Sequence, residues 1–96
     1  MKTLTEIKKQ LVNYKSILRK KYNVKEIGVF GSYSRGEQDR NSDIDILVVF
    51  DKPIGLEFID LAEELEIILK NKVDLVSKNA IKPKLMKYVE EDLIYV

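Results

Sequence analysis

The stretch FGSYSRGEQDRNSDIDILVVF, residues 30–50, joins a Gly-Ser step to a run of strand-forming residues. Its second half, Ile44 to Phe50, has the strongest strand pattern in the chain. Asp43 and Asp45 stand at the start of this strand, on either side of one isoleucine. Because side chains alternate along a strand, both carboxylates face the same side, roughly 6.5–7 Å apart at the backbone. Two carboxylates this close repel each other, and a divalent cation between them removes the repulsion.

The patterns on either side of this stretch alternate between helix and strand. Helical patterns cover residues 3–21, 32–36, 55–70 and 83–91, and strand patterns cover residues 25–30, 44–50, 73–76 and 93–96. This order predicts an α/β (α+β) fold in which helices flank a small mixed β-sheet. A length of 96 residues predicts one domain spanning residues 1–96.

Two of the predicted helices show an apolar stripe that we expect to pack on the sheet. The stripe of the first helix consists of Leu4, Ile7, Leu11, Tyr14 and Leu18. The stripe of the second long helix consists of Leu56, Ile59, Leu61, Leu65, Ile68 and Leu69.

A third carboxylate, Asp74, lies near the start of the short strand pattern at residues 73–76. If Asp45 and Asp74 share one site at the starts of their strands, these strands are parallel. The segment between them, residues 51–72, is long enough for the helical crossover that a parallel pair requires. The same assumption makes the strand that ends at Gly31 an antiparallel neighbour of the strand that starts at Asp43.

The Gly31-Ser32 step then faces the carboxylates across a gap. Glycine lets the backbone approach a ligand closely, and Ser32 adds a hydroxyl. A nucleoside triphosphate fits this arrangement, with its phosphates on Gly31-Ser32 and a metal joining them to Asp43 and Asp45. Asp74 would orient or deprotonate the attacking hydroxyl, and Arg35 could neutralise the departing pyrophosphate.

The composition excludes several classes of site. The chain contains neither cysteine nor histidine, so thiolate chemistry, disulfides and the usual zinc ligands are absent. No apolar run approaches a membrane span, and the N-terminus lacks the apolar core of a signal peptide, which predicts a cytoplasmic protein. Residues 1–25 are rich in Lys and Arg, but the net charge of +1 does not favour direct nucleic-acid binding.

Gly31-Ser32, ten further residues and then Asp43-Ile44-Asp45 together resemble the signature of the DNA polymerase β-like nucleotidyltransferase superfamily. The longer form, GSYSRGEQDRNSDIDILV, is similar to the minimal nucleotidyltransferase (MNT) proteins, which act as antitoxins beside a HEPN-domain toxin. The likeness covers nearly the whole chain, including VDLV around Asp74, and implies a polymerase β palm-like fold.

The resemblance implies a role for each residue of the motif. Gly31 and Ser32 would hold the triphosphate, Asp43 and Asp45 would bind Mg²⁺, and Asp74 would be the third, catalytic carboxylate and metal ligand. The implied reaction transfers AMP from ATP to a tyrosine hydroxyl of a partner HEPN ribonuclease. The larger second domain of some relatives has no counterpart here, so the acceptor surface is expected on a partner.

Three functional hypotheses remain open from the sequence. The first is the Mg²⁺-dependent protein adenylyltransferase, and the second is an antitoxin that acts mainly by occluding its partner. The third is a nucleotidyltransferase acting on RNA or a small molecule, although no concentrated basic channel follows the first helix. Three acidic residues that converge favour the enzyme, because a binding surface does not require them. The oligomeric state and the preferred base stay open.

Overall fold

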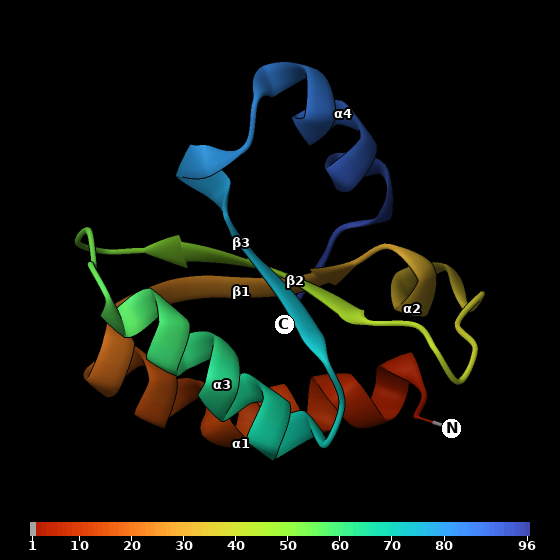
Figure 1. Cartoon of the computed structure of the whole chain (residues 1–96), viewed down its shortest axis with the longest axis horizontal. Coiled ribbons are helices and arrows are strands. Elements are labelled where there is room, and N and C mark those ends of the chain that lie inside the picture. Colours follow the sequence, from red (N-terminus) through yellow and green to blue (C-terminus); the bar gives the residue numbers. More distant parts are fainter. Residues whose placement is uncertain (1) are drawn as a thin grey trace.

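A computed structural model of the chain describes residues 2–96. Four helices, a four-stranded sheet and one 3-10 turn follow the predicted order (Figure 1). The helices are α1 (Leu4–Tyr22), α2 (Ser32–Arg35), α3 (Glu57–Leu69) and α4 (Pro83–Asp92), and the turn is η1 (Lys78–Ala80). The strands are β1 (Val24–Phe30), β2 (Ile44–Phe50), β3 (Val73–Ser77) and β4 (Ile94–Tyr95).

Local signals fix several of these boundaries. The Thr3 hydroxyl accepts a hydrogen bond from the backbone N–H of Glu6 and caps α1. At the other end of α1, Asn23 adopts a left-handed conformation with φ 59°, which stops the helix. Pro83 occupies the first turn of α4, where its missing N–H costs no hydrogen bond.

The sheet has the strand order β3-β2-β1-β4. β1 is antiparallel to both β2 and β4, whereas β2 and β3 are parallel. α3 supplies the crossover between the parallel strands, as their direction requires. Both predicted strand directions are therefore confirmed, and the mixed α/β fold is the one expected from the sequence.

The two faces of the sheet are covered unequally (Figure 1). α1 and α3 lie side by side on one face, below the sheet in the figure, while η1 and α4 stand on the other side. The helix-covered face holds a cluster of buried side chains that includes Ile44, Ile46 and Val48 of β2. Within the described α4, by contrast, no residue is buried.

The buried stripe of each long helix is narrower than the sequence indicates. Ile7, Leu11 and Leu18 of α1, and Leu61, Leu65 and Leu69 of α3, are fully buried. Three residues predicted in the stripes are instead exposed, namely Tyr14 at 39%, Leu56 at 82% and Ile59 at 57%. One row of side chains on each helix packs against the sheet, and the three residues named above lie outside that row and stay exposed. Leu56 also precedes the first residue of α3.

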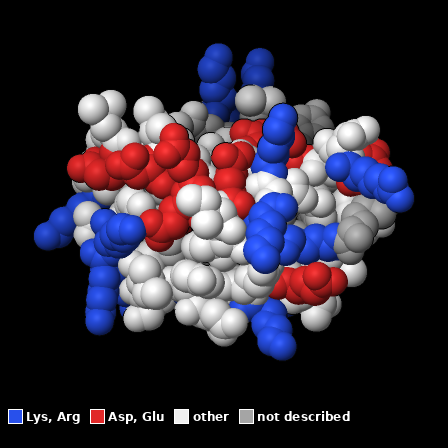
Figure 2. Space-filling model, turned by 60° about the horizontal axis from the view of Figure 1, so that its bottom comes forward, with Lys and Arg blue, Asp and Glu red and all other residues white. Residues whose placement is uncertain are grey.

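The outer surface of the helix layer is divided by charge. α3 carries five acidic residues and no basic one. Figure 2 shows acidic side chains gathered at the upper left of the helix layer. α1 is rich in Lys and Arg, and Lys21 Nζ lies 2.6 Å from Glu64 Oε1 of α3. The opposite charges therefore meet within the layer and support its helix pairing, at the modest energy of an exposed pair. Within residues 2–96, no helix is both long and apolar enough to cross a membrane.

Candidate active site

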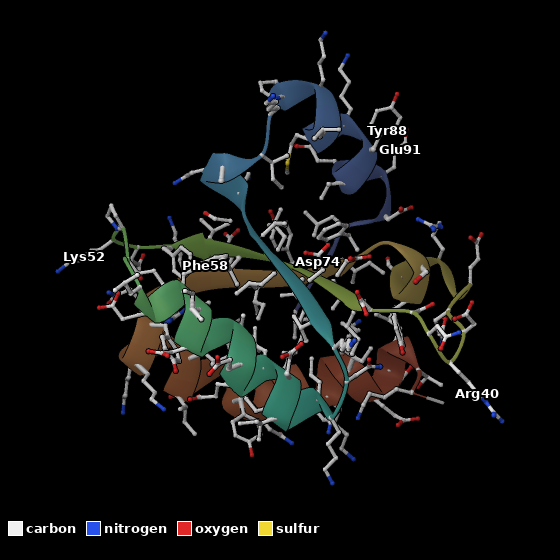
Figure 3. The ribbon with its side chains drawn as sticks, viewed as in Figure 1. Arg40, Lys52, Phe58, Asp74, Tyr88 and Glu91 are labelled. Atoms are coloured by element: carbon white, nitrogen blue, oxygen red, sulfur yellow. The ribbon has the colours of Figure 1, made fainter. Side chains whose placement is uncertain are left out.

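Strand register places two of the predicted aspartates side by side. In the parallel pairing of β2 with β3, the Cα partner of Asp45 is Asp74. The strand neighbours of these residues pack toward α1 and α3, so alternation turns both carboxylates to the opposite face. Figure 3 shows Asp74 on β3 near the crossing with β2, below α4 in the view. The predicted shared position of Asp45 and Asp74 is thus present in the fold.

Asp43, the third predicted carboxylate, immediately precedes β2 and is exposed. Its charge contributes to raising the pKa of Asp45, two residues further along the chain. Within residues 2–96, no three His, Cys, Asp or Glu side chains are arranged to hold a metal ion without movement.

The environment of Asp45 opposes its ionisation. Burial, followed by the charges of Asp74 and Asp43 and a hydrogen bond with Asp74, raises the pKa of Asp45 from 3.8 to about 6, against a small opposing effect of Arg35. A carboxylate that is half-buried among other carboxylates is stabilised by a bound cation. The hard oxygen donors of this group suit Mg²⁺.

Gly31 lies against the Asp45 carboxylate. Phe30 and Asp45 are Cα partners in the β1–β2 pairing, and Gly31 follows directly. Its φ of 74° and ψ of −151° belong to a region that only glycine adopts readily. A Cβ built on Gly31 would lie 2.1 Å from Asp45 Oδ2, which is far inside contact distance. The position therefore requires glycine for its backbone conformation and for the space beside the carboxylate.

Arg35, at the end of α2, contacts α4. Its Nη1 lies 2.6 Å from Asp92 Oδ2, and its Nε lies 3.1 Å from Glu37 Oε2. The Ser34 hydroxyl donates a hydrogen bond to the backbone carbonyl of Asp92. The predicted pyrophosphate ligand is therefore paired with acidic side chains, and α2 and α4 are joined through Asp92.

A cavity of about 370 Å³ gathers several of these residues. The predicted residues in its lining are Gly31, Ser32, Arg35 and Asp45, and the others are Phe30, Tyr88, Val89 and Asp92. Asp43 and Asp74 are not part of the lining. Sequence reasoning missed the three residues from α4, because the helical pattern at residues 83–91 does not indicate which part of the sheet the helix approaches.

A slightly larger hollow of about 430 Å³ lies elsewhere, at the start of α1, and includes Lys2, Arg40 and Lys70. Figure 3 shows Arg40 at the tip of its loop, pointing away from the molecule. This hollow contains none of the predicted site residues. We place the chemistry in the smaller cavity, because Gly31, Ser32 and Asp45 line it and Asp74 is the strand partner of Asp45.

Comparison with protein families identifies the family of the chain. The nucleotidyltransferase domain family matches residues 11–96. Protein adenylyltransferase MntA of Thermococcus cleftensis is 48% identical over 97 residues, covering 100% of this chain and 98% of the relative. A Methanocaldococcus jannaschii protein, provisionally named a protein adenylyltransferase, is 55% identical over 100 residues and both chains are completely covered.

Solved structures similar to this chain point to the same family. A crystal structure of a toxin–antitoxin with AMP-PNP superposes with a TM-score of 0.74 at 31% identity, covering 91% of this chain and 69% of the matched chain. A complex of a tri-AMPylated HEPN toxin with an MNT antitoxin from Shewanella oneidensis gives a TM-score of 0.61 at 26% identity, with coverages of 90% and 70%. The chain therefore belongs to the nucleotidyltransferase domain family and is an enzyme of the minimal nucleotidyltransferase type found in HEPN/MNT toxin–antitoxin pairs.

Proposed function

We propose that this protein is a Mg²⁺-dependent adenylyltransferase that transfers AMP from ATP to a tyrosine hydroxyl of a partner HEPN toxin and thereby acts as its antitoxin. The observation that carries the proposal is the in-register pair Asp45 and Asp74, with Gly31 directly against Asp45. The neighbouring carboxylates of Asp45 and Asp74, with Gly31 against Asp45, suit metal-assisted phosphoryl transfer better than binding alone.

Each residue has a proposed task. The backbone of Gly31 and the hydroxyl of Ser32 bind the triphosphate. Asp43, Asp45 and Asp74 would hold the metal, which would supply positive charge to the phosphates. Arg35 meets the pyrophosphate as it leaves, and would exchange its contact with Asp92 for a phosphate oxygen.

The chemical step is a displacement at the α-phosphorus of ATP. The tyrosine oxygen forms a bond to this phosphorus, and the bond to the oxygen that bridges to the β-phosphate breaks. Pyrophosphate leaves with that bonding electron pair, and the tyrosine proton passes to the carboxylate of Asp74. The products are an AMP–tyrosine phosphodiester and pyrophosphate.

The relatives support the choice of donor and acceptor. The toxin–antitoxin structure contains AMP-PNP, an analogue of ATP, and the Shewanella oneidensis complex contains a HEPN toxin that carries AMP. The Thermococcus cleftensis relative is named a protein adenylyltransferase. These relatives favour a protein acceptor over RNA or a small molecule.

The test is incubation with ATP, Mg²⁺ and the product of the neighbouring gene, followed by intact-protein mass spectrometry. We expect one or more AMP units on the partner with the wild-type chain and none with Asp43→Ala. Asp51→Asn is the matched control, because Asp51 is an exposed carboxylate in the turn after β2. A tight complex without any gain in mass would contradict the enzyme and favour an antitoxin that acts by occlusion.

A further inference from the structure

The cavity beside Asp45 has two chemically different walls. One is formed by Gly31, Ser32 and Asp45, which supply backbone, hydroxyl and carboxylate groups. The other comes from α4 and contains the aromatic ring of Tyr88 and the apolar side chain of Val89. A volume of about 370 Å³ falls within the usual range of small-molecule sites.

Tyr88 does not contribute to the hydrophobic core. Its side chain is 69% exposed, and within the described α4 no residue is buried. Figure 3 shows Tyr88 on the outer side of α4, above α2 in the view. The ring is therefore available to a ligand in the cavity.

The face of α4 that carries Tyr88 is oriented by Asp92, which lies four residues further along the helix. Residues four apart share one face of a helix, so the contacts of Asp92 determine which face of α4 meets the cavity. Asp92 is held by Arg35 at 2.6 Å, and its backbone carbonyl accepts a hydrogen bond from Ser34. Both contacts join this face of α4 to α2 in the nucleotide-free protein, and the Ser34 contact would remain when Arg35 turns to a phosphate oxygen.

A nucleoside triphosphate has the matching division, with an anionic chain at one end and a flat aromatic base at the other. We propose that Tyr88 is the platform on which the nucleobase of the donor stacks, so that the enzyme selects purine over pyrimidine triphosphates by stacking area. This inference rests on the proposed function, because it assumes that the triphosphate binds at Gly31 and Ser32. Stacking of a base on an aromatic side chain contributes enough to change affinity about tenfold or more.

The test measures the Kd of AMP-PNP and of inorganic tripolyphosphate, each with Mg²⁺, by isothermal titration calorimetry. We expect Tyr88→Ala to weaken AMP-PNP binding about tenfold or more, while tripolyphosphate binding is unchanged because it has no base. Tyr88→Phe should recover most of the affinity. Leu85→Ala is the matched control, because Leu85 is 56% exposed on the same helix but does not line the cavity.

A second readout compares ATP with UTP as competitors of AMP-PNP. Wild type should prefer ATP, and Tyr88→Ala should lose most of this preference. Unchanged AMP-PNP binding by Tyr88→Ala, or a parallel loss of tripolyphosphate binding, would overturn the inference and leave the proposed function standing. Wild-type protein that binds neither probe would overturn both.

Discussion

The two faces of the β-sheet have different roles: one packs the hydrophobic core, and the other carries the candidate site. Along β2, Ile44, Ile46 and Val48 enter the core beneath α1 and α3, whereas Asp45 turns to the sparsely covered face beside α4. The two-residue period of a strand lets one segment serve both purposes without mixing them. Substitutions on the two faces should therefore change different observables.

The largest expected effect concerns the chemistry at Asp74. We expect Asp74→Asn to slow AMP transfer by about 10²–10⁴-fold, which is the usual contribution of a general base, and to retain the fold. Single-turnover kinetics with the HEPN partner measures the rate, and circular dichroism checks the fold. A rate within a few-fold of wild type would remove Asp74 from the proposed mechanism.

Substitutions on the core face should instead lower the free energy of unfolding. Leu65 is fully buried in the cluster under the sheet, so Leu65→Ala should lower the free energy of unfolding by about 2–5 kcal/mol. Leu85→Ala, on the exposed helix of the other face, should cost within about 0.5 kcal/mol. Urea denaturation measures both, and equal losses would show that the two faces bury side chains equally.

Gly31→Ala should reduce both the stability of the fold and the binding of nucleotide. The added Cβ would lie 2.1 Å from Asp45 Oδ2, and φ would stay at 74°, where side chains are strained. We expect a loss of about 1–3 kcal/mol in stability together with loss of nucleotide binding. Gly36→Ala is the control, since its φ is 73° but nothing lies within 4 Å of an added Cβ. If Gly36→Ala also removed nucleotide binding, contact with Asp45 would not be the cause.

The smallest expected effect is the pH dependence of the metal-free protein. Because the pKa of Asp45 is raised from 3.8 to about 6, the folded chain keeps a proton between about pH 4 and 6 that the unfolded chain has released. Asp45 therefore lowers the free energy of unfolding increasingly as the pH rises through this window, and the loss is constant above it. Asp45→Asn should gain on the order of 1 kcal/mol at pH 8, after discounting for solvent screening, and nothing at pH 3.5.

Thermal melts of both proteins across this pH range measure that gain. Mg²⁺ with nucleotide should raise the melting temperature of wild type but not that of Asp45→Asn. Wild type should then be the more stable protein at pH 8. A variant less stable than wild type at pH 8 without metal would show that the charged carboxylate is favourable in the folded state.

The part of the site formed by the strands was predictable from the sequence. The assumption that Asp45 and Asp74 share one site predicts parallel β2 and β3 and antiparallel β1 and β2, and the register confirms both directions. These placements depend on backbone hydrogen bonding, whose geometry hardly varies between proteins. The same reasoning located both strands and their directions.

The placement of α4 and of the exposed apolar residues was not predictable. α4 buries no residue in the described structure, so its amphipathic pattern could not indicate its neighbour, and Tyr88 went unnoticed. Leu56 and Ile59 were assigned to a buried stripe because their spacing suits one. Burial depends on how each helix is rotated against the sheet, and spacing alone leaves that rotation open.

The register of β2 with β3 has a consequence for the abundance of this protein. Asp45 and Asp74 are far apart in sequence and meet only in the folded chain, so an unfolded chain has no nucleotide site. By mass action, a ligand at a hundred times its Kd would stabilise the folded state by about 2.7 kcal/mol. ATP and Mg²⁺ would then act as chemical chaperones. A cell depleted of ATP would lose folded antitoxin to proteolysis as well as losing the donor for modification.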